Sequence, residues 1–325
     1  MTLSVLRAAA EEPQRPALVV HRGAEARAGG AASAVVTFAA LADATRAAMR
    51  WLLQRGVRPG VAGQRVALSA GLEVTDLVLL YALFELGVPV VLLHPRLTAA
   101  ERAALLAECV PTLVIDDRGD DAERRWRFDE LTAGGWSAPP DDERPLAIVY
   151  TSGSAGRPKG VILSRAAFVA SAAASAANLG WRDDDRWLLC MPLAHVGGLS
   201  IVTRCLLARR PLVLRPAARF EPAALLAALV EDRVTLVSLV PTMLARLLEL
   251  PGFPPAPLRA VLLGGAAAPP TLLRTAAERG VPVLTTYGLT EACSQVTTQR
   301  LGTPPDPAHG AGPALPGVTL RIAAG

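Results

Sequence analysis

Lysine is almost absent from this sequence. The chain has 325 residues and 33 basic residues, and Lys159 is its only lysine. The arginines are scattered among 29 acidic residues, and aromatic residues make up only 4% of the chain. Proteins that bind nucleic acids usually carry clustered positive charge, often with interleaved aromatic side chains. The formal net charge of +4 is therefore no sign of a nucleic-acid partner.

Cysteine is also scarce, and no CxxC pair is present. The four cysteines, Cys109, Cys190, Cys205 and Cys293, are far apart and lie in or beside apolar runs. Zinc sites and disulfide frameworks need cysteines at recurring close spacings. We therefore expect buried thiols in a reducing compartment and no structural zinc site.

A long uninterrupted apolar run is missing as well. The most apolar region, residues 75–94, contains Asp76, Glu85 and Pro89, whereas a membrane-spanning helix needs about 20 apolar residues. Two acidic residues and a proline at 11–13 break the N-terminal region, so it does not resemble a secretory signal. The sequence predicts a cytoplasmic protein without a membrane partner.

What the chain has in abundance is apolar residues, at 51%, arranged as alternating short strands and longer Ala/Leu-rich helices. This alternation is typical of α/β proteins with largely parallel sheets. In the first stretch we expect strands at 65–69, 88–94 and 111–117, with helices at 75–87 and 98–109. After an exposed connection at 118–145, we expect strands at 146–153, 186–192, 211–216, 234–241, 259–265, 282–288 and 317–322, and helices from about 164, 221 and 269.

Four strand ends carry polar residues, at 151–160, 192–198, 264–268 and 287–295. Open parallel sheets bind ligands beyond the carboxyl ends of their strands. These four segments are therefore the candidate functional site.

The first of them, TSGSAGRPKG, offers backbone N–H groups, hydroxyls and glycines to an anion. It is not a Walker A loop, because Pro158 precedes Lys159 and Gly160 follows it, and it contains no GxGxxG fingerprint. It predicts a phosphate cradle. The alternative is an exposed Gly/Ser loop in which Lys159 is solvated.

The other strand ends also allow two interpretations. In YGLTE, Thr290 can donate to a phosphate, Glu291 can hold a divalent cation and Tyr287 can stack on a base. Alternatively, Thr290 is the N-cap of a helix. Gly264 and Gly265 by themselves indicate only a tight turn before a helix.

Three histidines can be considered as ligand contacts. His195 follows a strand and begins an apolar helix, a position where a histidine either bonds structurally or contacts a ligand. His94 and His309 are expected to be structural.

The segment YTSGSAGRPKGV, residues 150–161, resembles the phosphate-loop signature of the adenylate-forming superfamily, which includes acyl-CoA synthetases, luciferases and nonribosomal adenylation domains. Every position fits except Ala155, where a hydroxyl is usual. The segment YGLTE is similar to the family's Tyr-Gly-x-Thr-Glu motif, and the resemblance covers nearly the whole chain.

The resemblance assigns roles to residues of all four strand ends. It implies ATP, Mg²⁺ and coenzyme A, with His195 orienting the substrate carboxylate, Thr290 on the α-phosphate and Glu291 on the metal. The residues implied to bind ATP or AMP are Thr151, Ser152, Gly153, Ser154, Gly156, Lys159, Gly264, Gly265, Ala266, Thr286, Tyr287, Gly288 and Thr290.

Within the superfamily, the segments around His195 and after Glu291 look most like the o-succinylbenzoate CoA ligases of menaquinone synthesis. The residues implied to contact the acid are His195, Gly198, Arg204, Gly288, Ser294, Gln295 and Thr297. Arg204 is a candidate for the succinyl carboxylate, or else a solvated helix residue.

The implied reaction is attack of a carboxylate on the α-phosphorus of MgATP, followed by displacement of AMP by a thiol such as coenzyme A. The protein's part in the first step is positioning and charge stabilisation. The alternatives are another aryl- or acyl-CoA synthetase, or a noncatalytic adenylate-binding or scaffold protein.

The resemblance implies an α/β fold of two helix-flanked, largely parallel sheets and the start of an incomplete β-barrel. We expect one subdomain at about 65–190, a second at about 1–64 and 191–300, and the barrel start at about 301–325. The family's C-terminal domain contributes a catalytic lysine, which this chain lacks because Lys159 is its only one. We therefore expect a truncated N-terminal domain, residues 1–325, with little turnover; a homodimer is left open.

Overall fold

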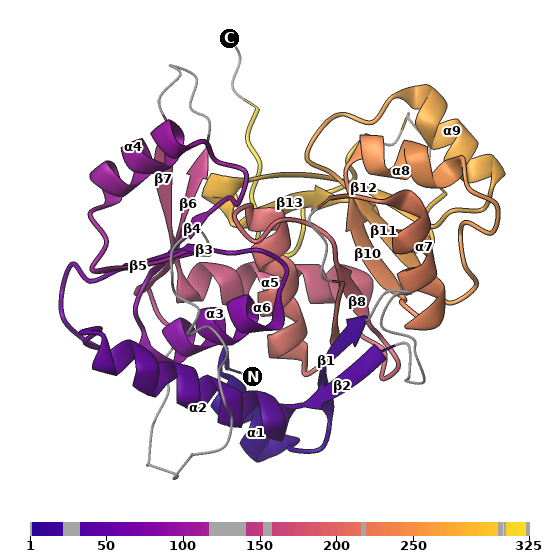
Figure 1. Cartoon of the computed structure of the whole chain (residues 1–325). Helices are drawn as coiled ribbons and strands as arrows, with labels where there is room; N and C mark the ends of the chain where they lie inside the picture. The colour runs from indigo at the N-terminus through magenta and orange to yellow at the C-terminus, as the bar shows by residue number, and fades with distance from the viewer. Residues whose placement is uncertain are drawn as a thin grey trace.

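The structure is a computed structural model that describes residues 2–21, 33–116, 141–151, 158–215, 219–304, 308 and 310–322. Two sheets with helices on their faces make up the molecule (Figure 1). The expected α/β fold of two largely parallel sheets is thus confirmed. In the described part of the chain, no helix has both the length and the apolarity to cross a membrane.

The first sheet has five strands. Their order is β5 (Leu113–Ile115), β3 (Val66–Ser69), β4 (Val90–Leu93), β6 (Pro145–Thr151) and β7 (Lys159–Ser164). Helices α3 (Val74–Leu86) and α4 (Ala99–Cys109) lie on opposite faces (Figure 1). Covering both faces makes β3 and β4 fully buried, which explains why they form continuous apolar runs in the sequence.

The second sheet has eight strands. Their order is β13 (Ser294–Thr298), β12 (Val283–Leu289), β11 (Ala260–Leu263), β10 (Leu236–Leu239), β8 (Trp187–Leu189), β9 (Leu212–Leu214), β1 (Pro16–His21) and β2 (Ser33–Thr37). The central strands pair in parallel, while β1/β2 and β12/β13 are antiparallel.

Helices fill the space between the sheets and cover the far side of the second one. Between the sheets lie α5 (Arg165–Leu179) and α6 (Val196–Ala208), and beyond the second sheet lie α7 (Pro222–Glu231), α8 (Pro241–Leu248) and α9 (Pro270–Glu278) (Figure 1). Local sequence sets several of their ends: Ser164 caps α5, Gly87 ends α3 in the left-handed conformation, and a proline begins each of α7 to α9.

The N-terminal helix α1 (Val5–Glu11) connects the two halves of the molecule. Glu85 of α3 is buried and accepts hydrogen bonds from the Ser4 hydroxyl (3.0 Å) and the backbone N–H groups of Val5 (2.6 Å) and Leu6 (3.2 Å). At the other end of α1, Glu11 pairs with Arg209, the residue that ends α6, at 2.9 Å. Helix α2 (Phe38–Gln54) packs against α1 and α3.

Three expectations about the fold need correction. Residues 317–322 form no strand; only Ala314 makes an isolated bridge, to Thr297, and Ile322 is 97% exposed because no sheet edge pairs with it. Strands β7 and β13 were not expected. Strand β8 belongs to the second sheet, so the strands of the first end at Ser164 rather than near residue 190. The division into subdomains is otherwise still a prediction.

Candidate active site

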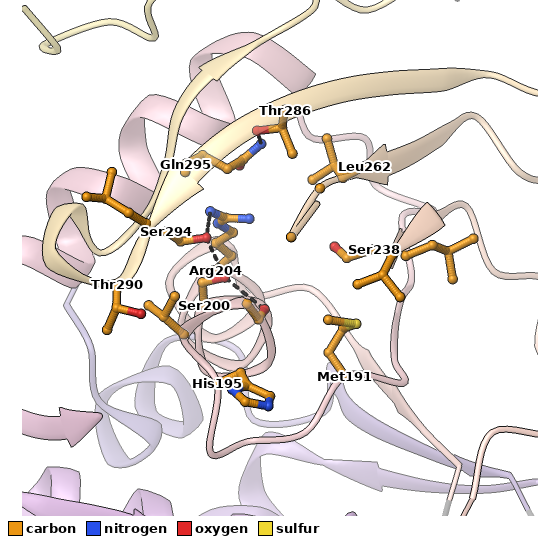
Figure 2. Close-up of a pocket in the computed structure, with 18 residues that line it drawn as sticks. Met191, His195, Ser200, Arg204, Ser238, Leu262, Thr286, Thr290, Ser294 and Gln295 are labelled. Atoms are coloured by element: carbon orange, nitrogen blue, oxygen red, sulfur yellow. Dashed lines mark hydrogen bonds between the residues drawn. The ribbon is translucent and has the colours of Figure 1, made fainter. Parts of the chain in front are cut away.

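A cavity of about 420 Å³ opens at the carboxyl ends of β10, β11 and β12. Its walls come from the second sheet and the segments that follow its strands, from α6, and from the residues just before that helix (Figure 2). This is the place where open parallel sheets bind ligands.

The cavity gathers residues from three of the four candidate segments. Those predicted from the sequence that line it are His195, Arg204, Gly264, Gly265, Thr286, Gly288, Thr290, Ser294 and Gln295. A neighbouring hollow of about 520 Å³ adds Ala266 and Tyr287, and shares Gly265, Thr286 and Gly288 with the first. The Tyr287 ring is 53% exposed there, open for stacking by a base.

Two residues expected to contact the acid lie outside the cavity wall. A Cβ on Gly198 would lie 2.3 Å from the Pro192 carbonyl oxygen, so this glycine is required by packing, and Gly197 takes its place in the wall. Thr297 is buried, and its carbonyl accepts a hydrogen bond from the Thr286 hydroxyl at 2.7 Å.

The expected phosphate loop begins and ends on a β-hairpin of the first sheet. Thr151 on β6 is the cross-strand partner of Lys159 on β7, and Lys159 is exposed. Ser152, Gly153, Ser154 and Gly156 lie outside the described residues, as does His309. Their roles are still predictions.

Arg204 is a buried cation at the cavity. Its side chain is 3% exposed, its guanidinium lies 5.6 Å from the Trp187 ring centroid, and its Nη2 donates a 3.5 Å hydrogen bond to Ser294. Its Nε has no hydrogen-bond partner, and no carboxylate of the described residues pairs with it. Burial lowers the pKa of Arg204 to about 10, which still leaves it charged at neutral pH. Arg204 is therefore not a solvated helix residue.

A backbone distortion positions Ser294 beside this guanidinium. Cys293 and Ser294 have φ values of 54° and 95°, unusual for residues other than glycine. The β12/β13 register shifts opposite them, between Tyr287 and Gly288. As a result the Ser294 hydroxyl lies within hydrogen-bond distance of Arg204 and, at 3.3 Å, of the Ser200 hydroxyl, which donates to it.

Gln295 lines the same wall and has a buried acceptor without a partner. Its side-chain Nε2 donates to the hydroxyls of Thr298 (2.8 Å) and Thr286 (3.2 Å). Its Oε1 has no partner although the residue is only 7% exposed. A buried oxygen without a donor is costly to the protein alone and is satisfied if a ligand supplies the hydrogen.

His195 occupies the N-cap position of α6, but its side chain makes no capping hydrogen bond. Its ring contacts that of His94, with centroids 5.5 Å apart. His94 ends β4 of the first sheet, and its Nδ1 accepts the Arg96 backbone N–H at 3.0 Å. Partial burial lowers the pKa of His195. The pKa of His94 is lowered as well, by partial burial and by the nearby His195 and Arg96.

The position of His94 beside the site was not predicted from the sequence. The only signal was its place at the end of an apolar strand, the same signal that drew attention to His195.

Thr290 and Glu291 form a single 3₁₀ turn after β12, in which Leu289, not Thr290, is the N-cap. Glu291 is exposed and makes no hydrogen bond or ion pair with any described residue, so its carboxylate is free to bind a cation. One carboxylate suits Mg²⁺ that is held mainly by water and phosphate oxygens. No group of three or more His, Cys, Asp or Glu side chains suited to a metal is present among the described residues.

Comparison with known proteins identifies related ligases. The chain is 36% identical over 276 residues to a 2-succinylbenzoate–CoA ligase of Bacillus cereus, a match that covers 81% of the chain and 56% of that protein. The chain thus spans little more than half the length of this relative.

Solved structures of the o-succinylbenzoate coenzyme A synthetase of Bacillus subtilis have the same fold. The complex with AMP superimposes with a TM-score of 0.80 at 30% identity, covering 96% of this chain and 80% of that one. The complex with ATP and a magnesium ion gives 0.77 at 31%, covering 96% and 64%. A family model described as AMP-binding enzyme matches residues 5–324, so the chain belongs to the AMP-binding enzyme family.

Proposed function

We propose that this chain is the acid- and nucleotide-binding part of an AMP-forming acid–thiol ligase that activates o-succinylbenzoate for transfer to coenzyme A. The observation that carries the proposal is Arg204, a buried guanidinium beside the cavity with no carboxylate partner among the described residues. A buried charge is costly unless it is paired. A dicarboxylic acid supplies the missing anion with one carboxylate while the other reacts.

Different polar residues would bind different groups of this substrate. Arg204 and the Ser294 hydroxyl would hold the succinyl carboxylate, and the Gln295 oxygen would accept a hydrogen bond from a bound ligand. His195, on the opposite side of the cavity from Gln295 (Figure 2), would orient the reacting carboxylate. Met191 and Leu262 provide apolar wall for an aromatic ring.

The nucleotide would occupy the neighbouring hollow and the 3₁₀ turn. Tyr287 would stack on adenine, Thr290 would donate to the α-phosphate, and Glu291 would bind the Mg²⁺ that neutralises phosphate charge. Lys159 and the loop preceding it would hold the β- and γ-phosphates. Because the reaction needs positioning and charge stabilisation more than proton transfer, these neutral donors and cations suffice for acid activation.

Location and assembly belong to the same proposal. The four cysteines are all free, which suits a reducing, cytoplasmic location. The proposal leaves room for a homodimer. The competing function, adenylate binding without catalysis, would use the same cavity.

Calorimetric titration with nonhydrolysable acyl adenylate mimics tests the proposal. We expect the o-succinylbenzoyl mimic to bind more tightly than benzoyl and medium-chain acyl mimics. A double variant, Thr290→Ala and Glu291→Ala, should weaken all three, because it removes contacts to the shared nucleotide. A preference for another acyl group would reject the substrate, and binding of none would reject the function.

A further inference from the structure

Ser238 is a polar residue in an otherwise apolar central strand. It lies on β10, between β8 and β11, and the other three residues of this strand are buried and hydrophobic. A strand covered on both faces is usually apolar throughout. Ser238, the one polar residue of this strand, lines the cavity.

The indole of Trp187 fixes the role of the Ser238 hydroxyl. Trp187 is fully buried, and its Nε1–H donates to the Ser238 oxygen at 3.3 Å. An indole can only donate, so the hydroxyl oxygen is the acceptor and its own hydrogen is left to be donated elsewhere. No described residue accepts that hydrogen. Figure 2 shows the hydroxyl pointing into the cavity from the wall that faces Arg204.

The surroundings of Ser238 suit an uncharged acceptor. The adjacent wall residues Leu239, Leu262 and Met191 are apolar, and the cationic group of the cavity, Arg204, is on the other side. A carboxylate would bind at the guanidinium, whereas a carbonyl oxygen needs only one neutral donor.

We propose that Ser238 is a specificity-determining residue that donates a hydrogen bond to a ketone oxygen of the acid. This inference rests on the proposed function, because the succinyl chain of succinylbenzoate is joined to the aromatic ring through a ketone. That ketone lies between the two carboxylates, and the Ser238 hydroxyl faces Arg204 across the cavity. Trp187 is then a positioning residue that orients the hydroxyl.

Two adenylate mimics that differ in one group test the inference. Both carry the succinylbenzoyl skeleton with a sulfamate in place of the phosphate, one with the ketone and one with a methylene. Calorimetry with the 325-residue chain should show tighter binding of the keto mimic. Ser238→Ala should weaken the keto mimic by roughly twofold to thirteenfold, the effect of one neutral hydrogen bond, and leave the methylene mimic unchanged.

Two further variants separate recognition from folding. Ser175→Ala removes another buried serine hydroxyl, on α5 away from the cavity, and should change neither affinity. Ser238→Cys keeps the side-chain volume but donates weakly, so it should show the same selective loss even if the alanine variant is unstable. Equal weakening of both mimics, or no ketone preference in the wild-type chain, would overturn the inference.

The failure of this inference differs from failure of the proposed function. If Ser238 is only a partner for Trp187, the wild-type chain would bind both succinylbenzoyl mimics equally and still prefer them to a benzoyl mimic. If neither succinylbenzoyl mimic binds, the proposed function and this inference fall together.

Discussion

At the scale of single residues, Arg204 shows the clearest conflict between folding and binding. It is buried with an unpartnered Nε and without a carboxylate, which is unfavourable for the folded chain alone. Replacing a buried charge by an apolar side chain of similar size is often neutral or stabilising. This conflict supports the proposal that Arg204 binds a carboxylate of the substrate.

We expect Arg204→Met to leave the free energy of unfolding of the unliganded chain unchanged or to raise it by about 1–4 kcal/mol. Urea denaturation measures this. The same variant should lose most of its affinity for a succinylbenzoyl adenylate mimic and keep its affinity for a benzoyl mimic. A large loss of stability, with equal loss of both ligands, would show that Arg204 mainly supports the fold.

Residues at the site were only partly predictable. His195 and Thr290 follow strands, where sequence patterns point to ligand contacts, and the structure brings them together with Arg204 and Ser294, which only the family resemblance indicated. Ser238 could not be found this way, because it sits inside a strand and its importance comes from Trp187, 51 positions away. Side-chain contacts between distant segments leave no local pattern in the sequence.

At the scale of elements, the β12/β13 hairpin shapes the cavity. A Cβ on Gly288 would lie 2.0 Å from the Ser294 carbonyl oxygen, a backbone atom that cannot move without changing the bulge. Glycine at this position therefore allows the distortion that aims Ser294 at Arg204.

We predict that Gly288→Ala destabilises the chain by about 2–4 kcal/mol, since strain and overpacking have costs of this order. It should also weaken binding of the succinylbenzoyl mimic. Gly197→Ala is the matched control: it lies on α6, where an added Cβ meets only the Met191 methyl at 3.9 Å, and Gly to Ala in a helix stabilises by about 0.5–1 kcal/mol. Thermal unfolding and calorimetry measure both effects. Similar stability of the two variants would contradict the prediction.

Elements buried on both faces were predicted well, and edge elements were not. Strands β3, β4, β10 and β11 read as apolar runs because helices cover both sides. Strand β7 reads as a continuation of the Gly/Ser loop, and its Ile162 is 63% exposed. Strand β13 is rich in polar residues that form hydrogen bonds within the hairpin. Residues 317–322 have the residue pattern of a strand, but no neighbouring strand pairs with them.

At the scale of the whole molecule, α1 acts as a connection between the two sheets. Glu85 beneath its first turn and Arg209 beside its last residue belong to helices that pack on different sheets. This connection could not be predicted from the sequence, because its contacts join residues about 80 and 200 positions apart.

We expect Glu85→Ala to destabilise the chain by about 3 kcal/mol, because it leaves buried donors of Ser4, Val5 and Leu6 without an acceptor. Hydrogen exchange should show lost protection at the start of α1 first. Glu85→Gln retains an acceptor and is the control. Unchanged exchange in the alanine variant would rule out the connecting role.

The two Glu85 variants also predict a pH dependence. Burial raises the pKa of Glu85, so the folded chain binds its proton at pH values where the unfolded chain has lost it. Stability from this group is complete below its unfolded pKa of about 4.5 and decreases as pH rises through the folded value. Glu85→Gln should lack this decrease in urea titrations at successive pH values.

The two sheets divide the proposed chemistry unequally. The residues that line the main cavity come from the second sheet, from the segments that follow its strands, and from α6 and the residues before it, whereas Lys159 lies on a hairpin of the first sheet. Under the proposed function, different parts of the fold would therefore select the acid and bind the polyphosphate. We expect that transplanting α6, β10 and β13 from a related chain would transfer the acid preference of that chain. The hairpin that carries Lys159 would remain unchanged.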